Sequence, residues 1–460
     1  MDTPREKFYK SKDPKSLQTE ELIAILLGHG TAKQDVFSLS KDIVAFIRSK
    51  TNGYLTIEDL TQFDGIGKVK AIQILAALEL SQRFQTTFSS SMFSKMDWDF
   101  TDVSQSERQN GVHFFHPYPA KFIPQIPSRI IKYIAKKDDI VVDPFMGSGT
   151  TLIESKKAGF TSYGFDTNPL AVQIAKAKTM EISEDFVTEI NGFLSWARKQ
   201  KTIVLTQPNE TKGPLLFEDS NIWFRPDVEY SLKLILDEIS KFTLNTQNFL
   251  KVGLSSILKG ISNARMDSII PTLPKATIYV DRKHYYREVD NSNRNIPVFQ
   301  RLYSQINRMK VALLEFNKET SPEVKCTAFL EDARTMSKYI QRCNLVITSP
   351  PYWSAQNYEE NQKLAFKLFN LQTLPGAEIG RNKNQYLREM ELVFIEIAKI
   401  LQGHLAIVIG EDTQNGLHEI LFTKIVNCGF YHVDTVARRI SNQTARSKQI
   451  ITEYIYLFRN

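Results

Sequence analysis

Asp139-Ile-Val-Val-Asp143-Pro-Phe-Met-Gly147-Ser-Gly149-Thr-Thr151 is the stretch of this 460-residue chain that decides its fold. Apolar, β-branched residues run into a glycine-rich turn, and a helix-compatible run from Leu152 to Ala158 follows. This order predicts a strand, a turn and a helix at the start of a nucleotide-binding α/β sheet. The two glycines let backbone N–H groups approach a ligand where a Cβ would collide. Ordinary tight turns use such a pair too, so the interpretation depends on the segments around it.

Six further segments have the pattern of strands. The seven predicted strands cover residues 140–143, 162–166, 326–330, 345–348, 405–409, 431–438 and 450–458. Helix-compatible runs separate the first five, which predicts a mostly parallel sheet with right-handed crossovers. A polar loop, 441–448, joins the last two, and we expect these to pair antiparallel at one edge. The chain is therefore predicted to contain a seven-stranded, doubly wound, Rossmann-like α/β sheet.

Three further segments near these strands change the interpretation of the glycine turn. They are His116-Pro-Tyr118-Pro-Ala-Lys121-Phe122, Tyr163-Gly-Phe-Asp166-Thr-Asn168-Pro169 and Asn344-Leu-Val-Ile-Thr-Ser349-Pro350-Pro351-Tyr352-Trp353. Together with the glycine turn they resemble the exocyclic-amine DNA methyltransferases, which make N4-methylcytosine or N6-methyladenine. The resemblance runs from about Phe114 to the C-terminus, apart from a long insertion. It implies the methyltransferase version of the doubly wound fold.

The same resemblance implies S-adenosylmethionine as the cofactor. Asp166 stands 23 residues after Asp143, close to the ~20-residue offset expected of a ribose-binding acid. The family places its adenine contact just after the third strand, at Asp332, with Glu331 as the alternative. A dinucleotide is the competing ligand, but the turn lacks a third glycine, and Asp143 would repel a pyrophosphate and tolerate a sulfonium. The predicted cofactor-binding residues are Tyr118, Lys121, Asp143, Pro144, Phe145, Gly147, Gly149, Thr150, Asp166, Asn168 and Asp332.

Within that set, Tyr118 and Lys121 precede the first strand, in the segment that lines the cofactor's carboxylate end in the family. Lys121 could pair with the carboxylate, and Tyr118 could pack on the amino-acid moiety. A proline-rich loop that only braces the first helix is the alternative. No metal is predicted to take part.

The Ser349-Pro350-Pro351-Tyr352 corner is predicted to be catalytic. Consecutive prolines remove N–H donors and leave carbonyls free to point into a pocket. If the Ser349 hydroxyl and the Pro350 carbonyl accept the hydrogens of a base amine, its nitrogen can pyramidalise towards the methyl group. Alignment with the sulfonium is then the main source of rate. Tyr352 would stack on a base flipped out of the duplex. A rigid surface turn is the alternative.

Serine at the first position of this tetrapeptide leans, within the family, towards cytosine N4, whereas Asp or Asn leans towards adenine N6. We therefore expect a site-specific DNA methyltransferase that acts on cytosine N4. Methylation of adenine N6 is the first alternative. RNA base-amine methyltransferases share the tetrapeptide and the strand order. A catalytically silent nucleic-acid-binding protein built on these domains is an alternative from another class.

Residues 1–84 are predicted to form a small all-helical domain. Helices are expected over 20–27 with Thr19 as the cap, over 36–47, after Thr56, and over 68–83. Between the last two lies Phe63-Asp-Gly65-Ile-Gly67-Lys68-Val-Lys70-Ala71, a helix–hairpin–helix signature in which a helix N-terminus and two lysines would hold a phosphate. With Glu21-Leu-Ile-Ala-Ile-Leu-Leu-Gly28 this domain resembles the N-terminal domain of RadC-type proteins, without their metal-binding portion. A plain helical hairpin is the alternative.

Residues 85–110, rich in Ser, Thr, Gln and Asp, are predicted to link this domain to a catalytic domain over 111–460. Inside the catalytic domain, 182–324 is an insertion that the sheet does not need. Its basic and aromatic second half suits target recognition, and a solvated helical face with packed tyrosines is the alternative. The predicted nucleic-acid-binding residues are Gly65, Gly67, Lys68, Lys70, Arg282, Lys283 and Arg287.

The composition agrees with a nucleic-acid partner. The net charge is +7, which suits double-stranded DNA. The three cysteines are widely separated, without metal-ligand spacing. No window has the pattern of a membrane span or a signal peptide. We expect a bacterial cytoplasmic protein that associates with the nucleoid through DNA. The family implies a restriction–modification or phage-defence setting, with a cognate endonuclease or defence-system subunits as partners.

Overall fold

The computed structural model describes most of the chain. The described residues are 3–11, 17–31, 34–49, 55–78, 93–100, 103–104, 107, 110–119, 123–200, 215–266, 268, 270–273, 296–351, 358–376, 379, 382–411, 416–439 and 452–460. They divide into two compact units, Met1–Lys95 and Met96–Asn460. The predicted boundaries, 1–84 and 111–460 with a linker between them, stay predictions. No helix of the described part is long and apolar enough to cross a membrane.

The larger unit is built on a seven-stranded sheet in the order β3-β2-β1-β4-β5-β7-β6. Its strands are β1 (Val141–Asp143), β2 (Ser162–Asp166), β3 (Cys326–Leu330), β4 (Cys343–Thr348), β5 (Leu401–Gly410), β6 (Tyr431–Arg439) and β7 (Thr452–Arg459). The first five run parallel, and β7 lies antiparallel between β5 and β6. The predicted α/β class and the antiparallel edge pair are confirmed. The first two residues of the predicted last strand, 450 and 451, lie outside the described residues.

The strand order reverses between β1 and β4, which are neighbours in the sheet. In open parallel sheets, ligands bind in the crevice at the carboxyl ends of the strands where this reversal occurs. Asp143 ends β1, and Ser349 directly follows β4. The topology therefore brings the glycine turn and the double-proline corner to the same edge of the sheet.

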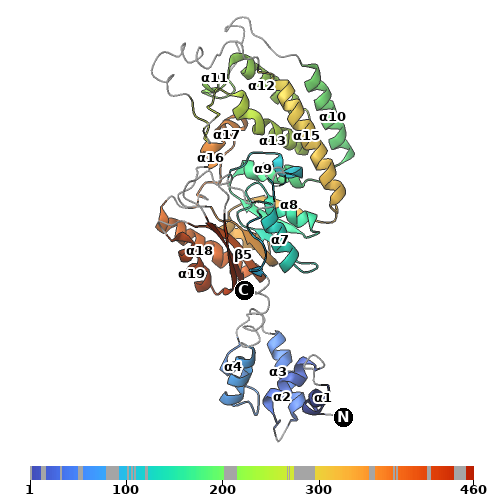
Figure 1. The fold of residues 1–460 in the computed structure, drawn as a ribbon, viewed down its shortest axis with the longest axis vertical. Coiled ribbons are helices and arrows are strands. Elements are labelled where there is room, and N and C mark those ends of the chain that lie inside the picture. Colours follow the sequence, from blue (N-terminus) through green and yellow to red (C-terminus); the bar gives the residue numbers. More distant parts are fainter. Residues whose placement is uncertain are drawn as a thin grey trace. The chain divides into compact units, whose positions relative to one another are not determined.

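Helices cover both faces of this sheet (Figure 1). One face packs against η4 (Ala333–Lys338), α18 (Lys383–Ile400) and α19 (Leu417–Asn427). The other carries α7 (Gln125–Ile134), α8 (Thr150–Lys157) and α9 (Pro169–Thr179). The strand residues Val141 and Val142 are 0% exposed, as expected for β-branched residues sandwiched between two helical layers.

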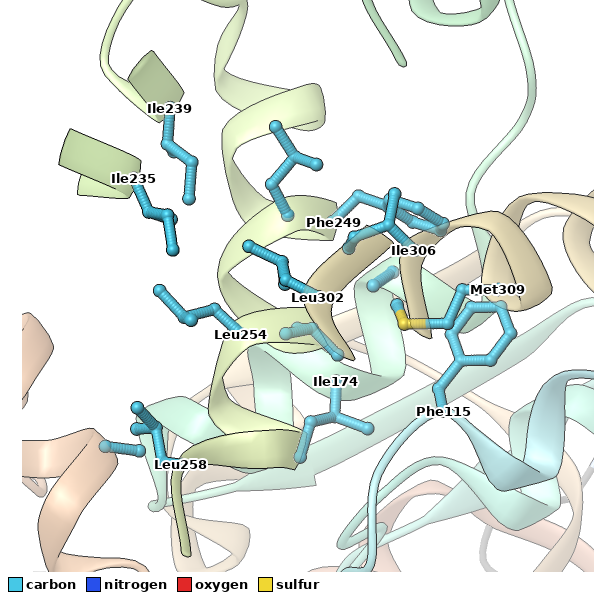
Figure 2. Close-up of a cluster of buried hydrophobic side chains, with 14 of the residues drawn as sticks. Phe115, Ile174, Ile235, Ile239, Phe249, Leu254, Leu258, Leu302, Ile306 and Met309 are labelled. Carbon is cyan, nitrogen blue, oxygen red and sulfur yellow. The ribbon is translucent and has the colours of Figure 1, made fainter. Parts of the chain in front are cut away.

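The predicted insertion holds α10 (Glu184–Lys199), α11 (Ser220–Trp223), α12 (Pro226–Ile239), α13 (Leu244–Ile261) and α15 (Val298–Glu319). These helices share one hydrophobic cluster with Phe115, which directly follows η2 (Gly111–Phe114), and with Ile174 of α9 (Figure 2). At Gly253 an added Cβ would lie 2.2 Å from the Ile306 side chain, so α13 and α15 approach closely. The insertion therefore extends the core of the catalytic unit. The predicted DNA contacts Arg282, Lys283 and Arg287 lie outside the described residues.

Part of the predicted linker packs on the catalytic unit. Trp98 and Phe100 are buried, and the Arg129 guanidinium of α7 lies 4.1 Å from the centre of the Phe100 ring. The backbone N–H of Arg439, at the end of β6, donates to the Asp99 carboxylate. Aromatic burial and these two arginines anchor this segment beside α7 and β6.

The smaller unit is helical, as predicted. It contains α1 (Pro4–Ser11), α2 (Thr19–Leu27), α3 (Val36–Ser49), α4 (Ile57–Thr61) and helical residues 68–78. Thr56 caps α4, since its hydroxyl accepts the Asp59 N–H at 3.2 Å. The predicted Thr19 cap was wrong by one residue. Gln18 is the N-cap, because its N–H donates to the Glu21 carboxylate at 2.7 Å and starts the helix one position earlier.

Candidate functional site

The buried carboxylate of Asp143 joins the ends of β1 and β4. One oxygen accepts the Thr348 hydroxyl at 2.8 Å and the Phe145 N–H at 3.1 Å. The other accepts the Thr151 hydroxyl of α8 at 2.6 Å. Because Thr348 immediately precedes Ser349, these bonds fix the start of the double-proline corner beside the glycine turn. Neither threonine was singled out from the sequence.

Asp143 is 1% exposed, so a ligand cannot reach its carboxylate without opening these bonds. Burial raises its pKa from the ordinary 3.8 to about 6, although the three donors oppose that rise. The carboxylate is therefore ionised at neutral pH. The geometry favours a role in shaping the turn over direct contact with a cofactor.

The glycine turn that follows is compressed from two sides. Gly147 has a φ of +50°, and an added Cβ would lie 3.2 Å from the Tyr118 ring. Gly149 has a φ of +81°, and its Cβ would lie 2.9 Å from the Cβ of Ala175 in α9. Only glycine fits both the backbone conformation and the space. Thr150 then begins α8.

A buried lysine that the sequence did not reveal supports the same turn. The ammonium of Lys178, in α9, donates to the Ser148 carbonyl at 3.1 Å, and Lys178 is 0% exposed. Lys178 lies two residues after Lys176 in the last turn of α9, and nothing in the sequence distinguishes the buried lysine from its neighbour. It places a positive charge beneath the turn.

Asp166, at the end of β2, holds the other side of the turn. Its carboxylate accepts the Gly147 N–H at 2.9 Å and the Asn168 N–H at 2.8 Å. Burial, and then the nearby charge of Asp143, raise its pKa to about 6 against the pull of these donors. Asp166 stays partly exposed, unlike Asp143. Because each carboxylate oxygen can accept two hydrogen bonds, Asp166 retains capacity for further donors.

Asn168 connects the segment before β1 to the segment after β4. Its side-chain oxygen accepts the N–H groups of Leu170 and Ala171 and so caps α9. Its amide nitrogen lies 3.4 Å from the Tyr118 hydroxyl and 3.4 Å from the side-chain oxygen of Gln362. Gln362 is the N-cap of α17 (Lys363–Phe369), and the sequence gave no reason to choose it.

Asp332 follows β3, as predicted, but its carboxylate already has a partner. It accepts the Arg334 N–H at 2.8 Å and pairs with the Arg334 guanidinium through both oxygens. Arg334 also donates to the Gly376 carbonyl at 2.9 Å and lies 3.5 Å from Glu389 of α18. Glu331, the alternative, bonds the Tyr339 hydroxyl and raises its pKa. The end of β3 therefore presents a carboxylate–guanidinium pair.

The remaining predicted residues fall into three groups. Pro144 and Phe145 lie in the turn, and Ser349, Pro350 and Pro351 continue from β4, with Ser349 partly exposed and Pro350 buried. Lys121 and Tyr352 lie outside the described residues, so their placement stays a prediction. Gly65, Gly67, Lys68 and Lys70 belong to the smaller unit. There Gly65 has a φ of +82° and the Lys70 ammonium lies 3.3 Å from the His29 carbonyl.

Two family models match the chain. One, described as a DNA methylase, matches residues 33–177. The other, described as a D12 class N6 adenine-specific DNA methyltransferase, matches residues 123–358, just over half of the chain. The second match contains β1 to β4 and therefore both the glycine turn and the double-proline corner.

Curated relatives match both parts of the chain. The Type II methyltransferase M.MjaII of Methanocaldococcus jannaschii is 23% identical over 446 residues, covering 79% of this chain and 83% of that protein. The Type II methyltransferase M.MvaI of Kocuria varians is 27% identical over 289 residues, covering 60% of this chain and 61% of that protein. A UPF0758 protein of Bacillus pumilus is 45% identical over 87 residues, so the chain spans only 38% of it. This last match falls in the N-terminal region and agrees with the RadC-like domain predicted there.

Among solved structures, TrmN from Thermus thermophilus matches 75% of this chain and 51% of its own at 9% identity, with a TM-score of 0.29. Because that superposition is weak, the fold assignment rests on the strand order of the sheet.

Proposed function

Since this chain belongs to the DNA methyltransferases that modify exocyclic base amines and use S-adenosylmethionine, we propose that it methylates cytosine N4 at a specific DNA sequence. The choice of cytosine is supported by Ser349, because serine at that position of the tetrapeptide leans towards this base in the family. The relatives named Type II methyltransferases support sequence-specific action.

The observation that carries the proposal is the hydrogen bond between Thr348 and Asp143. It ties the residue before the corner to the residue before the glycine turn. A methyl donor held over the turn and a base amine held at the corner would thus meet at one strand junction. Such alignment of two reactants accounts for a large part of the rate in a transfer that needs no covalent adduct to the enzyme.

The residues of the turn suit this cofactor. The positive φ of Gly147 keeps its backbone open under Tyr118, and Asp166 stays accessible with unused acceptor capacity for ribose hydroxyls. Two carboxylates at this edge favour a cationic ligand over a phosphate. When bound, S-adenosylmethionine supplies an electrophilic methyl group on a sulfonium.

At the corner, the chain's own groups would orient the acceptor. The Ser349 hydroxyl and the Pro350 carbonyl would accept the two hydrogens of the amine, which frees the nitrogen lone pair from the ring. The proline rings remove competing N–H donors from this stretch. Tyr352 would stack on the flipped base and hold its amine in line with the donor.

Adenine N6 is the second candidate, because the D12 class model matches residues 123–358. The two candidates are separated by incubating duplex DNA with methyl-labelled S-adenosylmethionine, digesting it to nucleosides and identifying the labelled species by mass spectrometry. We expect N4-methyldeoxycytidine. Labelled N6-methyldeoxyadenosine would replace the first proposal with the second. Label in RNA alone, or cofactor binding without any transfer, would refute both.

We further propose that the smaller unit holds duplex DNA through the turn formed by Gly65 and Gly67, with Lys68 supplying charge at the phosphate backbone. The chain would work beside a cognate restriction endonuclease or defence subunits. Substituting Lys68 by Ala should weaken DNA binding equally for all sequences and reduce its dependence on salt. A change in the methylated sequence instead would argue that this unit takes part in target choice.

A further inference from the structure

The side chain of Gln362 has a donor group that no described residue satisfies. Gln362 is 7% exposed, and its amide nitrogen is buried without a hydrogen-bond partner in the described part of the chain. A buried N–H group left without an acceptor costs about 1–3 kcal/mol, so native structures rarely keep one without a reason.

The orientation of this amide follows from its neighbour. Asn168 must point its oxygen at α9, because that oxygen accepts the N–H groups of Leu170 and Ala171. The Asn168 side-chain nitrogen therefore faces Gln362. The side-chain oxygen of Gln362 must accept this donor, at 3.4 Å. Turning the Gln362 amide over would place two donors against each other. The nitrogen of Gln362, with two hydrogens, is thus committed to a partner outside the described residues.

The surroundings identify the kind of partner. Asn168 also contacts the Tyr118 hydroxyl, and the Tyr118 ring packs over Gly147. This is the β1 side of the proposed cofactor site, where the turn would hold the methionine end of the cofactor. The ribose and adenine belong at the ends of β2 and β3. The methionine end carries an ammonium, which can only donate, and a carboxylate, which accepts.

We propose that the side-chain nitrogen of Gln362 binds the carboxylate of the cofactor's methionine moiety. This inference rests on the family's cofactor and on the proposed position of its methionine end over the Gly147 turn. It adds a ligand from α17, the segment that follows the catalytic corner in sequence. Binding of the cofactor would thereby also hold α17 against Asn168.

The test compares two ligands that differ only in the carboxylate. S-adenosylmethionine and its decarboxylated form are titrated calorimetrically into the full chain and into Gln362→Leu, which keeps the side-chain volume and removes the donors. We expect the leucine variant to bind S-adenosylmethionine about tenfold or more weakly, the scale of a hydrogen bond to a charged group. The decarboxylated ligand should bind both proteins alike, which also shows that the variant pocket is intact.

A second variant, Gln362→Glu, keeps the acceptor for Asn168 and places a negative charge before the carboxylate. This variant should bind S-adenosylmethionine more weakly than Gln362→Leu does. Its affinity for the decarboxylated ligand should not fall. Gln300→Leu, an exposed glutamine of α15, is the matched control. Equal losses for both ligands, or no loss for either as expected of a nitrogen that binds only water, would overturn the proposal. The assay uses neither DNA nor methyl transfer, so its outcome is independent of which base is methylated.

Discussion

Replacing Asp143 by Asn should change how the stability of the chain depends on pH, because the native carboxylate is buried at a cost. Asn has nearly the same shape, keeps an acceptor for the Phe145 N–H and the Thr348 hydroxyl, and cannot ionise. A pKa of about 6 in the folded chain, against the ordinary 3.8, corresponds to about 3 kcal/mol. That cost is present above pH 6 and is relieved as Asp143 takes up a proton.

The sign follows from proton uptake. Between pH 4 and pH 6 the folded chain binds a proton at Asp143 that the unfolded chain has lost, so this group makes the wild type less stable as the pH rises. The variant has no such term. Its free energy of unfolding minus that of the wild type should therefore rise by about 2 kcal/mol from pH 4 to pH 7, most of the full linkage term. Loss of the Asp143 charge also lowers the pKa of Asp166, which adds to the same trend.

The assay is urea unfolding of both proteins without cofactor at several pH values. The quantity to compare is the difference between the unfolding free energies of the two proteins at each pH. His113 titrates in the same pH range and changes the stability of both proteins in the opposite direction. Burial lowers the pKa of His113 to about 4, so its term weakens the fold as the pH falls, equally in both proteins. The matched control is Asp237→Asn, which replaces an exposed aspartate of α12. A difference that stays flat or falls with rising pH would refute the reasoning.

Three further changes test the site. Ser349→Ala should lower kcat on the order of a hundredfold with cofactor affinity unchanged; a parallel loss of affinity in calorimetry would contradict its assignment to the base. The affinity of the wild type for S-adenosylmethionine should fall tenfold per pH unit below about 6, because protonated Asp166 no longer attracts a cation or accepts ribose hydroxyls as a carboxylate. Asp166→Asn should bind S-adenosylmethionine more weakly, and its affinity should not change with pH in this range. A pH dependence that persists in the variant would belong to another group. Arg334→Leu should destabilise the chain by about 2 kcal/mol in urea unfolding, since it leaves two carboxylates facing each other; an unchanged midpoint would show that the pair is solvated.

The sequence predicted the sheet well because its strands are short apolar runs bounded by glycine, proline or acids. β2 and β3 match their predicted ranges at both ends. β4 and β5 are longer than predicted, because Cys343 and Leu401 pair with each other across the sheet. Pairing between strands that are distant in sequence extends a strand beyond the point where its own pattern stops.

The contacts that build the site were much harder to predict. The bond from Asp143 to Thr348 depends on the register that sets Val141 beside Leu345, and no local pattern contains that register. The contact of Gln362 with Asn168 likewise joins residues 194 positions apart. Motifs located the acids and the prolines. Their partners are threonines, a glutamine and a lysine that belong to no motif, so their roles are visible only in the folded structure.

The acids that end β1 and β2 show why this edge of the sheet suits a cation. The Asp143 carboxylate is buried and accepts three hydrogen bonds, while the Asp166 carboxylate accepts two backbone N–H groups and stays partly exposed. Both have pKa values raised to about 6, so the protein bears the cost of two ionised, poorly solvated carboxylates at neutral pH. A sulfonium bound nearby would offset that cost, whereas a phosphate would increase it. The two acids therefore favour a positively charged ligand beside the glycine turn.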